Sequence, residues 1–211
     1  MKKFGIILFF VGALLTACEN KNQTTAKSKE SAEVQTPSES PKPQTIKTEA
    51  FSARKGIVLI KGFTSIGTVK SKDAGRVSVE TVELRDASNP KSQELGIKID
   101  VLGFSQGMGR VADSISFIDY DEIDSLIKGL DYIAKIDKSV TTMSDFEVTY
   151  KTKSDFSISV FNDSKGKLSS VVSSGNRTAN VYLSLDELEK IKSLFVKAKQ
   201  SLDTLKNGSP K

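Results

Sequence analysis

Phe117-Ile118-Asp119-Tyr120-Asp121-Glu122-Ile123 (residues 117–123) marks the point where the hydrophobic pattern of this 211-residue chain changes its period. Before it, apolar and polar residues alternate, which is typical of strands with one buried face. After it, apolar residues recur every three or four positions as far as Ile136, which predicts an amphipathic helix. Tyr182-Leu183-Ser184-Leu185-Asp186-Glu187-Leu188 (residues 182–188) repeats the change 65 positions later. We therefore expect two helices, each preceded by a block of strands.

The block before the first helix is predicted to contain four strands, at residues 57–60, 77–84, 95–101 and 114–117. Within 77–84 the apolar residues change phase, which predicts a β-bulge near Thr81. In the last strand Ile115 and Phe117 alternate with serines and are expected to face the core.

The second block repeats this order, with strands expected at residues 146–150, 156–160, 168–172 and 180–183. Residues 163–166 predict a hairpin loop in which Gly166 accepts a positive φ. Each helix is preceded by a capping-box pattern, formed by Asp119 with Glu122 and by Ser184 with Glu187. The predicted fold class is α+β, an antiparallel sheet or partial barrel with two helices. The halves suggest a duplicated β-β-β-β-α unit; the alternative is two unrelated junctions that use the same capping chemistry.

The N-terminus carries a separate signal. Lys2 and Lys3 precede an apolar run over residues 4–15, which is shorter than the ~20 residues of a membrane-spanning helix and fits a cleaved signal peptide. Leu15-Thr16-Ala17-Cys18 follows, and it resembles the lipobox of bacterial lipoproteins. The resemblance implies cleavage before Cys18 and transfer of a diacylglyceryl group to its sulfur. The alternatives are an ordinary secretory signal with a free Cys18, or an uncleaved anchor.

Four regions follow from these patterns. Residues 1–17 are the expected signal peptide, and residues 18–50 are the lipidated cysteine and a disordered tether rich in Ser, Thr, Gln, Lys and Pro. Residues 51–206 are expected to form a single α+β domain, followed by a disordered tail at 207–211. A flexible tether of this length would hold the domain roughly 30 Å from the membrane.

Composition excludes several kinds of chemistry. The chain has no His, so His-based catalysis and His-ligated zinc are excluded, and lipidation of its one Cys would exclude thiol chemistry. Loss of Lys2 and Lys3 with the signal lowers the formal charge from +5 by two, to +3. We expect no nucleic-acid partner, because this mild charge comes with no clustered basic or aromatic platform.

Two stretches are candidate sites. Asp119, Asp121, Glu122 and Asp124 could offer oxygen ligands to Ca²⁺ or Mg²⁺, but acidic residues at a helix start are also what capping favours, so no metal site is predicted. Residues 103–110, with three glycines, lack the Gly-Lys-Ser/Thr ending of a phosphate loop and predict a hairpin loop between strands. We expect this loop to contact a partner through Phe104, Met108 and Arg110.

The sequence therefore predicts a membrane-anchored protein of the bacterial cell envelope, without cofactors, whose domain binds or assembles with an envelope protein and is not an enzyme. Its anchor, the lipid on Cys18, does not indicate which membrane holds it. The alternative is a small enzyme or ligand-binding protein that uses carboxylate and Lys groups in a pocket of the sheet.

Overall fold

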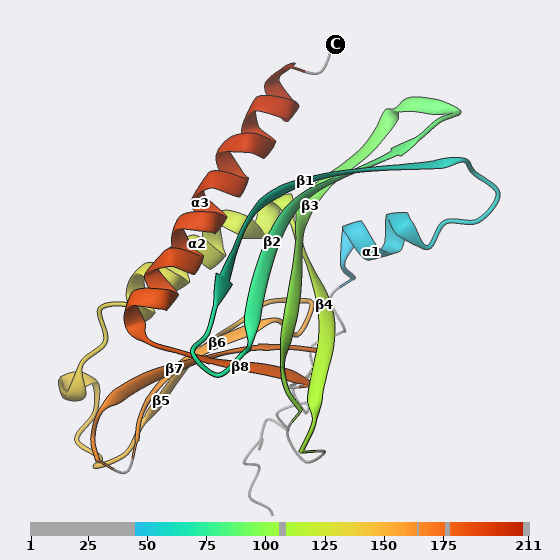
Figure 1. The fold of residues 1–211 in the computed structure, drawn as a ribbon. Coiled ribbons are helices and arrows are strands. Elements are labelled where there is room, and N and C mark those ends of the chain that lie inside the picture. Colours follow the sequence, from blue (N-terminus) through green and yellow to red (C-terminus); the bar gives the residue numbers. More distant parts are fainter. Residues whose placement is uncertain (1–44, 106–108, 164, 176–177, 209–211) are drawn as a thin grey trace, which may run out of the picture. The chain divides into compact units, whose positions relative to one another are not determined.

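The computed structural model describes residues 45–105, 109–163, 165–175 and 178–208 (Figure 1). In chain order the elements are α1 (Lys47–Ser52), β1 (Leu59–Lys70), β2 (Arg76–Asp86), β3 (Asn89–Phe104), β4 (Val111–Asp119), a 3₁₀ turn (Tyr120–Glu122), α2 (Ile123–Ile133), a second 3₁₀ turn (Lys138–Val140), β5 (Glu147–Lys151), β6 (Ser157–Asn162), β7 (Leu168–Ser174), β8 (Ala179–Leu183) and α3 (Leu185–Gly208). The α+β class is confirmed, as is the order of four strands, a helix, four strands and a helix.

The strands form one open antiparallel sheet, in the order β1-β2-β3-β8-β7-β6-β5, with β4 paired to the other edge of β3. Each half is a meander of four consecutive strands. The halves meet where Phe104 of β3 pairs with Asn180 of β8, and the Asn180 amide donates to the Phe104 carbonyl at 3.0 Å. Within the described residues β1 and β5 end the sheet without pairing to each other, so the sheet is not closed into a barrel.

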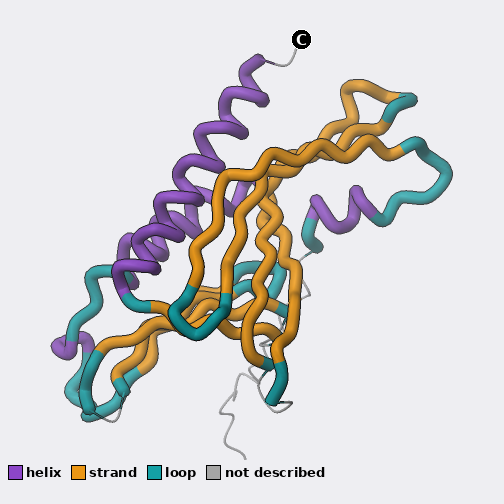
Figure 2. The backbone as a smooth tube through the Cα atoms, viewed as in Figure 1, coloured by secondary structure: helices purple, strands orange, loops and turns teal. Residues whose placement is uncertain are grey.

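Helices α2 and α3 lie on one side of the β1–β4 half, and α1 lies on the other side (Figures 1 and 2). A single core joins α2 and α3 to strands of both halves. Within it, the rings of Phe156 and Phe195 meet edge to face with centroids 6.0 Å apart. The side chains of Ile97 and Ile99 are fully buried, which confirms the predicted alternation of β3.

Strand β2 buries both of its faces. Val77 and Val79 belong to the main core, whereas Val82 and Leu84 form a second cluster with Phe51 of α1. The apolar pattern therefore changes phase because the first part of β2 faces the main core, whereas the later part faces α1 on the other side of the sheet. The predicted bulge at Thr81 is wrong, because β2 keeps a regular register there with both neighbours. The irregularity lies in β1, between Ser65 and Gly67.

The predicted burial phase of β4 is also wrong. Ile115 is 49% exposed, whereas Ser116 and Ile118 are buried. The inward face of β4 meets β7, where the hydroxyls of Ser116 and Ser174 lie 2.7 Å apart. Small polar side chains fit this close contact because they hydrogen-bond to each other, and the apolar residue points outward instead.

The two junctions are capped differently. The predicted capping box of α3 is confirmed, since Ser184 N–H donates to Glu187 Oε2 at 2.7 Å and Glu187 N–H donates to Ser184 Oγ at 3.3 Å. The predicted box of α2 is wrong. Asp119 instead accepts hydrogen bonds from the start of α1, and Glu122 accepts one from the Lys153 N–H at 2.9 Å.

Both predicted boundaries of the domain fall inside helices. Helix α1 begins at Lys47, within the expected tether, and Thr48 is 1% exposed. Helix α3 continues to Gly208, two residues into the expected tail. The start of the folded unit could not be recognised locally, because the group that holds α1 is Asp119, more than seventy residues away in the sequence.

Candidate functional site

The side of β1–β4 that faces away from α2 and α3 is only partly covered by α1. Phe51 of α1 packs on Val82 and Leu84, and no other described residue covers the remainder of this side. We call the uncovered part the open face. Strand pairing places its side chains on four rows, formed by Ser65, Glu80 and Lys98; by Thr68, Ser78, Asp100 and Ile115; by Lys70, Arg76, Leu102 and Asp113; and by Phe104 and Val111.

Large apolar side chains lie along one side of the open face. Phe104 is 47% exposed, Val111 is 59% exposed and Ile115 is 49% exposed. Phe104 and Val111 are paired across β3 and β4, and Ile115 lies four residues further along β4. We call these three residues the apolar strip. They share one face because odd-numbered positions of β4 and even-numbered positions of β3 point the same way.

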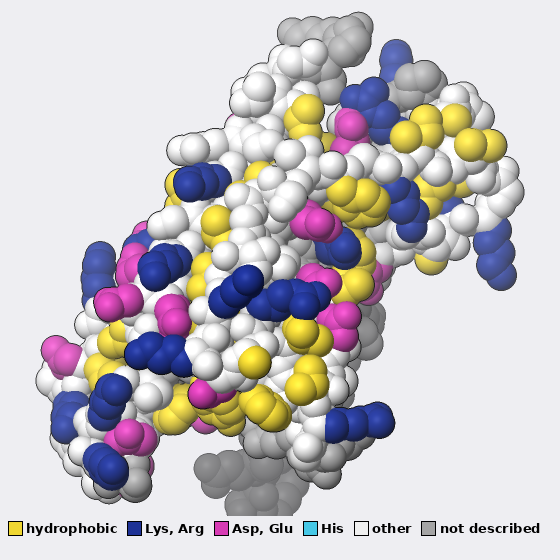
Figure 3. Space-filling view, viewed as in Figure 1, with side chains coloured by type: hydrophobic (Ala, Val, Ile, Leu, Met, Phe, Trp, Pro, Cys, Tyr) yellow, Lys and Arg dark blue, Asp and Glu magenta, His cyan; other side chains and the backbone are white. Residues whose placement is uncertain are grey.

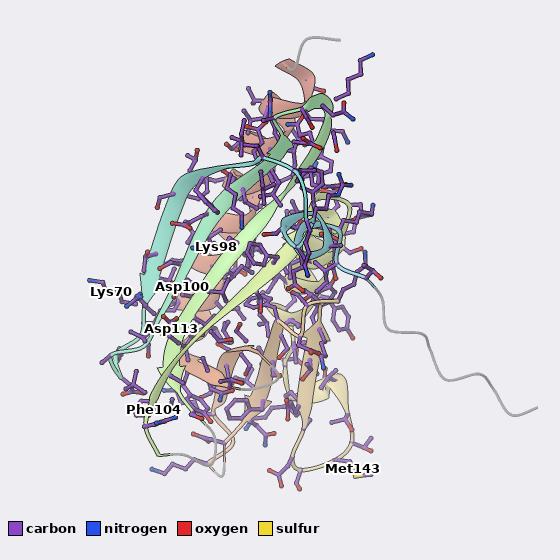
Figure 4. All side chains as sticks on the ribbon, turned by 90° about the vertical axis from the view of Figure 1, so that its right-hand side faces the viewer. Lys70, Lys98, Asp100, Phe104, Asp113 and Met143 are labelled. Carbon is purple, nitrogen blue, oxygen red and sulfur yellow. The ribbon has the colours of Figure 1, made fainter. Side chains whose placement is uncertain are left out.

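Charged side chains lie beside the strip, mainly on β2 and β3. Lys98 Nζ contacts Glu80 Oε2 at 3.0 Å, and Arg76 contacts Asp100 Oδ1 at 3.7 Å. Lys98, Asp100, Asp113 and Phe104 follow one another down the sheet in Figure 4. Positive and negative side chains alternate here, so the open face has no strong charge of one sign.

Among these charged groups, Asp100 has a buried carboxylate oxygen without a hydrogen-bond partner in the described structure. Its Oδ1 atom is buried and accepts no hydrogen bond, because Arg76 is too far away for one. Burial raises the pKa of the Asp100 carboxyl, the nearby charge of Asp113 raises it further, and Arg76 partly offsets both effects. A cation placed by a partner beside the exposed part of the Asp100 side chain would offset the cost of its charge.

The predicted contact residues are only partly described. Phe104 lies on the apolar strip, and Arg110 is exposed at the end of the hairpin, where its carbonyl accepts from the Ser105 N–H at 2.9 Å. Met108 lies outside the described residues. The sequence reasoning missed Val111 and misplaced Ile115, although the alternation of β4 carried the signal in its opposite phase.

The carboxylates at the start of α2 are engaged by separate partners. Asp121 contacts Lys47 Nζ at 2.6 Å, and Asp124 lies 3.7 Å from Lys199 Nζ. Each of these two carboxylates therefore already has a cationic partner on another helix, Lys47 on α1 or Lys199 on α3. Among the residues that the structure describes, no group of three or more His, Cys, Asp or Glu side chains could hold a metal ion.

Among the shallow hollows elsewhere on the described structure, two contain aromatic or titratable side chains that could contact a ligand. One, of about 400 Å³, is lined by Glu122, Tyr150 and Lys153 among others, and burial raises the pKa of both Glu122 and Tyr150. The other, of about 600 Å³, is lined in part by Phe161 and Tyr182, whose rings meet edge to face. The first hollow has titratable groups that could take part in proton transfer, but Glu122 is already held by the Lys153 N–H.

Cys18 lies outside the described residues. In the described part of the chain, no helix has the length and apolar character needed to cross a membrane. The chain matches no protein-family model, and a comparison with curated proteins found no similar one.

Proposed function

We propose that this chain is a bacterial envelope lipoprotein, anchored through lipid on Cys18, whose domain binds a protein partner through the open face and is not an enzyme. The lipobox-like Leu15-Thr16-Ala17-Cys18 supports the anchor. The two acyl chains of a diacylglyceryl group are enough for stable attachment, whereas a single chain is marginal.

The apolar strip is the observation that carries the binding role. Three large apolar side chains on one sheet face leave about half of their surface in water. Completing their burial would contribute on the order of 1 kcal/mol each. Exposed apolar residues of this kind, beside polar ones, are typical of protein interaction surfaces.

The balance of charges on the open face favours one class of partner over another. Three cationic groups, Lys70, Arg76 and Lys98, are matched by three carboxylates on the same face, those of Glu80, Asp100 and Asp113. A polyanion would meet as many repulsive groups as attractive ones. A protein surface with an apolar patch and mixed charges fits better, since complementary charges would set its orientation.

The anchor is tested by the intact mass of the mature protein and by detergent phase partitioning, with Cys18→Ala as the control variant. We expect an N-terminal mass that fits diacylglyceryl-cysteine, and both the modification and membrane retention should be lost in the variant. An unmodified Cys18 in soluble mature protein would refute the anchor.

The binding face is tested by photo-crosslinking in intact cells. A photoreactive amino acid replaces Ile115, or Met143 as the matched control, since Met143 is 71% exposed and lies outside the open face (Figure 4). We expect a defined crosslinked partner from position 115 and none from position 143. The double variant Phe104→Ser and Val111→Ser should remove the crosslink, while a melting temperature lowered only modestly would show that the domain stays folded. Identical products from both positions would refute the assignment.

The alternative function is that of a small enzyme or ligand-binding protein, and one observation indicates where its site would lie. The hollow beside Glu122, Tyr150 and Lys153 combines a carboxyl and a phenol whose pKa values are raised by burial. Screening the full chain against small molecules by thermal shift, with Tyr150→Phe as the comparison, tests it. A ligand whose stabilisation disappears in Tyr150→Phe would favour the alternative, and the lack of any such ligand would count against it.

A further inference from the structure

The first half of β1 is the most exposed strand segment of the sheet. From Ile60 to Ser65 every described residue is exposed, on both faces of the strand. Three of the neighbouring side chains are large and apolar: Val58 is 69% exposed, Ile60 51% and Phe63 50%. Hydrophobic side chains gather over the projecting end of β1 and the β2–β3 hairpin (Figure 3). Packing against α2 or α3 does not account for these exposed apolar side chains.

No described strand lies beside the outer edge of β1. β1 ends the strand order and pairs only with β2 in the described structure. An uncovered edge of this length offers a row of backbone N–H and C=O groups to another strand. Natural edge strands are commonly protected by charges or by proline, but between Leu59 and Val69 the only charged residue is Lys61 and there is no proline.

The other free edges in the described structure are less suited to strand addition. β4 has nine residues and carries two carboxylates, Asp113 and Asp119, and charged side chains are one of the devices that discourage edge pairing. β5 has only five residues, and the ring of Tyr150 packs against Gly129 of α2. β1 is therefore the edge that is suited to strand addition.

We propose that this edge pairs with the same edge of a second copy of the chain, giving an antiparallel β1–β1 contact with a two-fold axis at Gly62. The regular register of β1 extends from Leu59 to Ser65, before the irregularity at Gly67. Gly62 is the middle of this segment. An axis there pairs the whole segment with its copy in one self-complementary contact.

The side chains favour this register. It sets Lys61 opposite Phe63 of the second copy, twice by symmetry, so that each ammonium group faces an aromatic ring and no like charges meet. The same face already shows this contact within one chain, where Lys98 Nζ lies 5.5 Å from the centre of the Phe63 ring. Ile60 lies opposite Thr64, both compatible with a strand. The contact uses β1 alone and does not depend on the proposed partner of the open face.

The register is tested by disulfide crosslinking of the full-length protein in membranes. An added Cβ at Gly62 meets nothing closer than 3.8 Å, so Gly62→Cys is expected to fold. Residues opposite each other in antiparallel strands have Cα atoms about 4.5–5.5 Å apart, within the range of a disulfide. Mild oxidation should give a covalent dimer whose linked peptides contain position 62. Lys70→Cys, beyond the irregularity, is the control and should not crosslink.

A pair of charge substitutions at Phe63 distinguishes this register from nonspecific association of two copies. Phe63→Lys sets a new cation opposite Lys61 of the second copy, whereas Phe63→Glu sets a carboxylate there. We expect Phe63→Lys to weaken self-association about tenfold in analytical ultracentrifugation, since two like-charge pairs form, and Phe63→Glu to preserve it. Both variants lose the same exposed ring, so their melting temperatures provide a folding control. Equal weakening by both, or equal crosslinking at positions 62 and 70, would overturn the proposal.

Discussion

Replacing Asp119 by Ala should release α1 from the sheet. The Asp119 carboxylate is buried, and it accepts from Lys47 N–H at 2.8 Å, from Thr48 N–H at 3.0 Å and from Thr48 Oγ1 at 2.8 Å. It therefore caps the start of a helix that is distant in sequence. Helix α1 has six residues, too few to be stable alone, so its order depends on this cap and on the packing of Phe51.

The size of the effect follows from these contacts. Loss of an N-cap costs about 1 kcal/mol. The buried Thr48 hydroxyl would also lose its acceptor, which costs roughly 1–3 kcal/mol. Together these give a loss of about 2–4 kcal/mol in the stability of docked α1. The loss cannot greatly exceed the free energy of docking, because α1 can detach while the main core stays folded.

Hydrogen exchange measured by mass spectrometry checks this prediction. In Asp119→Ala the amides of residues 47–53 should exchange between about thirtyfold and several hundredfold faster, while those of β3 and α3 change little. Asp121→Ala is the matched control. It removes a half-exposed, solvent-screened ion pair to the Lys47 ammonium, and should speed exchange far less than Asp119→Ala does. Equal exchange in the two variants, or a uniform increase across the domain, would refute the reasoning.

Three further predictions concern stability, each measured by urea unfolding. Because burial raises the pKa of Glu122, the folded state favours its protonated form, so its charge costs stability above the folded pKa and the cost fades as pH falls towards the unfolded value of 4.5. Glu122→Gln keeps an acceptor for the Lys153 N–H and should be more stable than the wild type at pH 7.5, with a smaller gain at pH 5. Ser184→Ala removes the cap of α3 and should cost about 1 kcal/mol at either pH. Gly103→Ala should destabilise the join between the two halves, because its Cβ would clash with the Asn180 carbonyl oxygen. Gly62→Ala is the comparison, because an added Cβ at Gly62 meets nothing closer than 3.8 Å.

Periodicity predicted those elements whose surroundings are uniform along their length. β3 faces one core throughout, and α3 buries Leu188, Ile191 and Phe195 at helical spacing, so both were recognised. β1 was predicted only at residues 57–60, whereas it runs from Leu59 to Lys70. Its first half has two exposed faces, and without a buried face there is no alternation to detect.

The missed features depend on contacts between distant residues. Helix α1 lies in a polar segment, and it forms because Asp119 caps it and Phe51 finds Val82 and Leu84. These partners come together only after β2 and β4 have paired with β3. The candidate site shows the same dependence. Phe104 was predicted from its loop, whereas Ile115 was assigned to the core because an exposed apolar residue and a buried one look alike in the sequence.

Shared capping chemistry does not explain why the two strand-to-helix junctions are similar in sequence. Residues 117–123 and 182–188 match in sequence, and shared capping chemistry was the alternative to duplication. Only the second junction has a capping box, since Asp119 holds α1 instead. On the duplication hypothesis, the first junction exchanged its own cap for a contact with an element that the second half lacks. Related chains without α1 should then carry Ser or Thr in place of Asp119. An acidic residue there in chains without α1 would contradict the hypothesis.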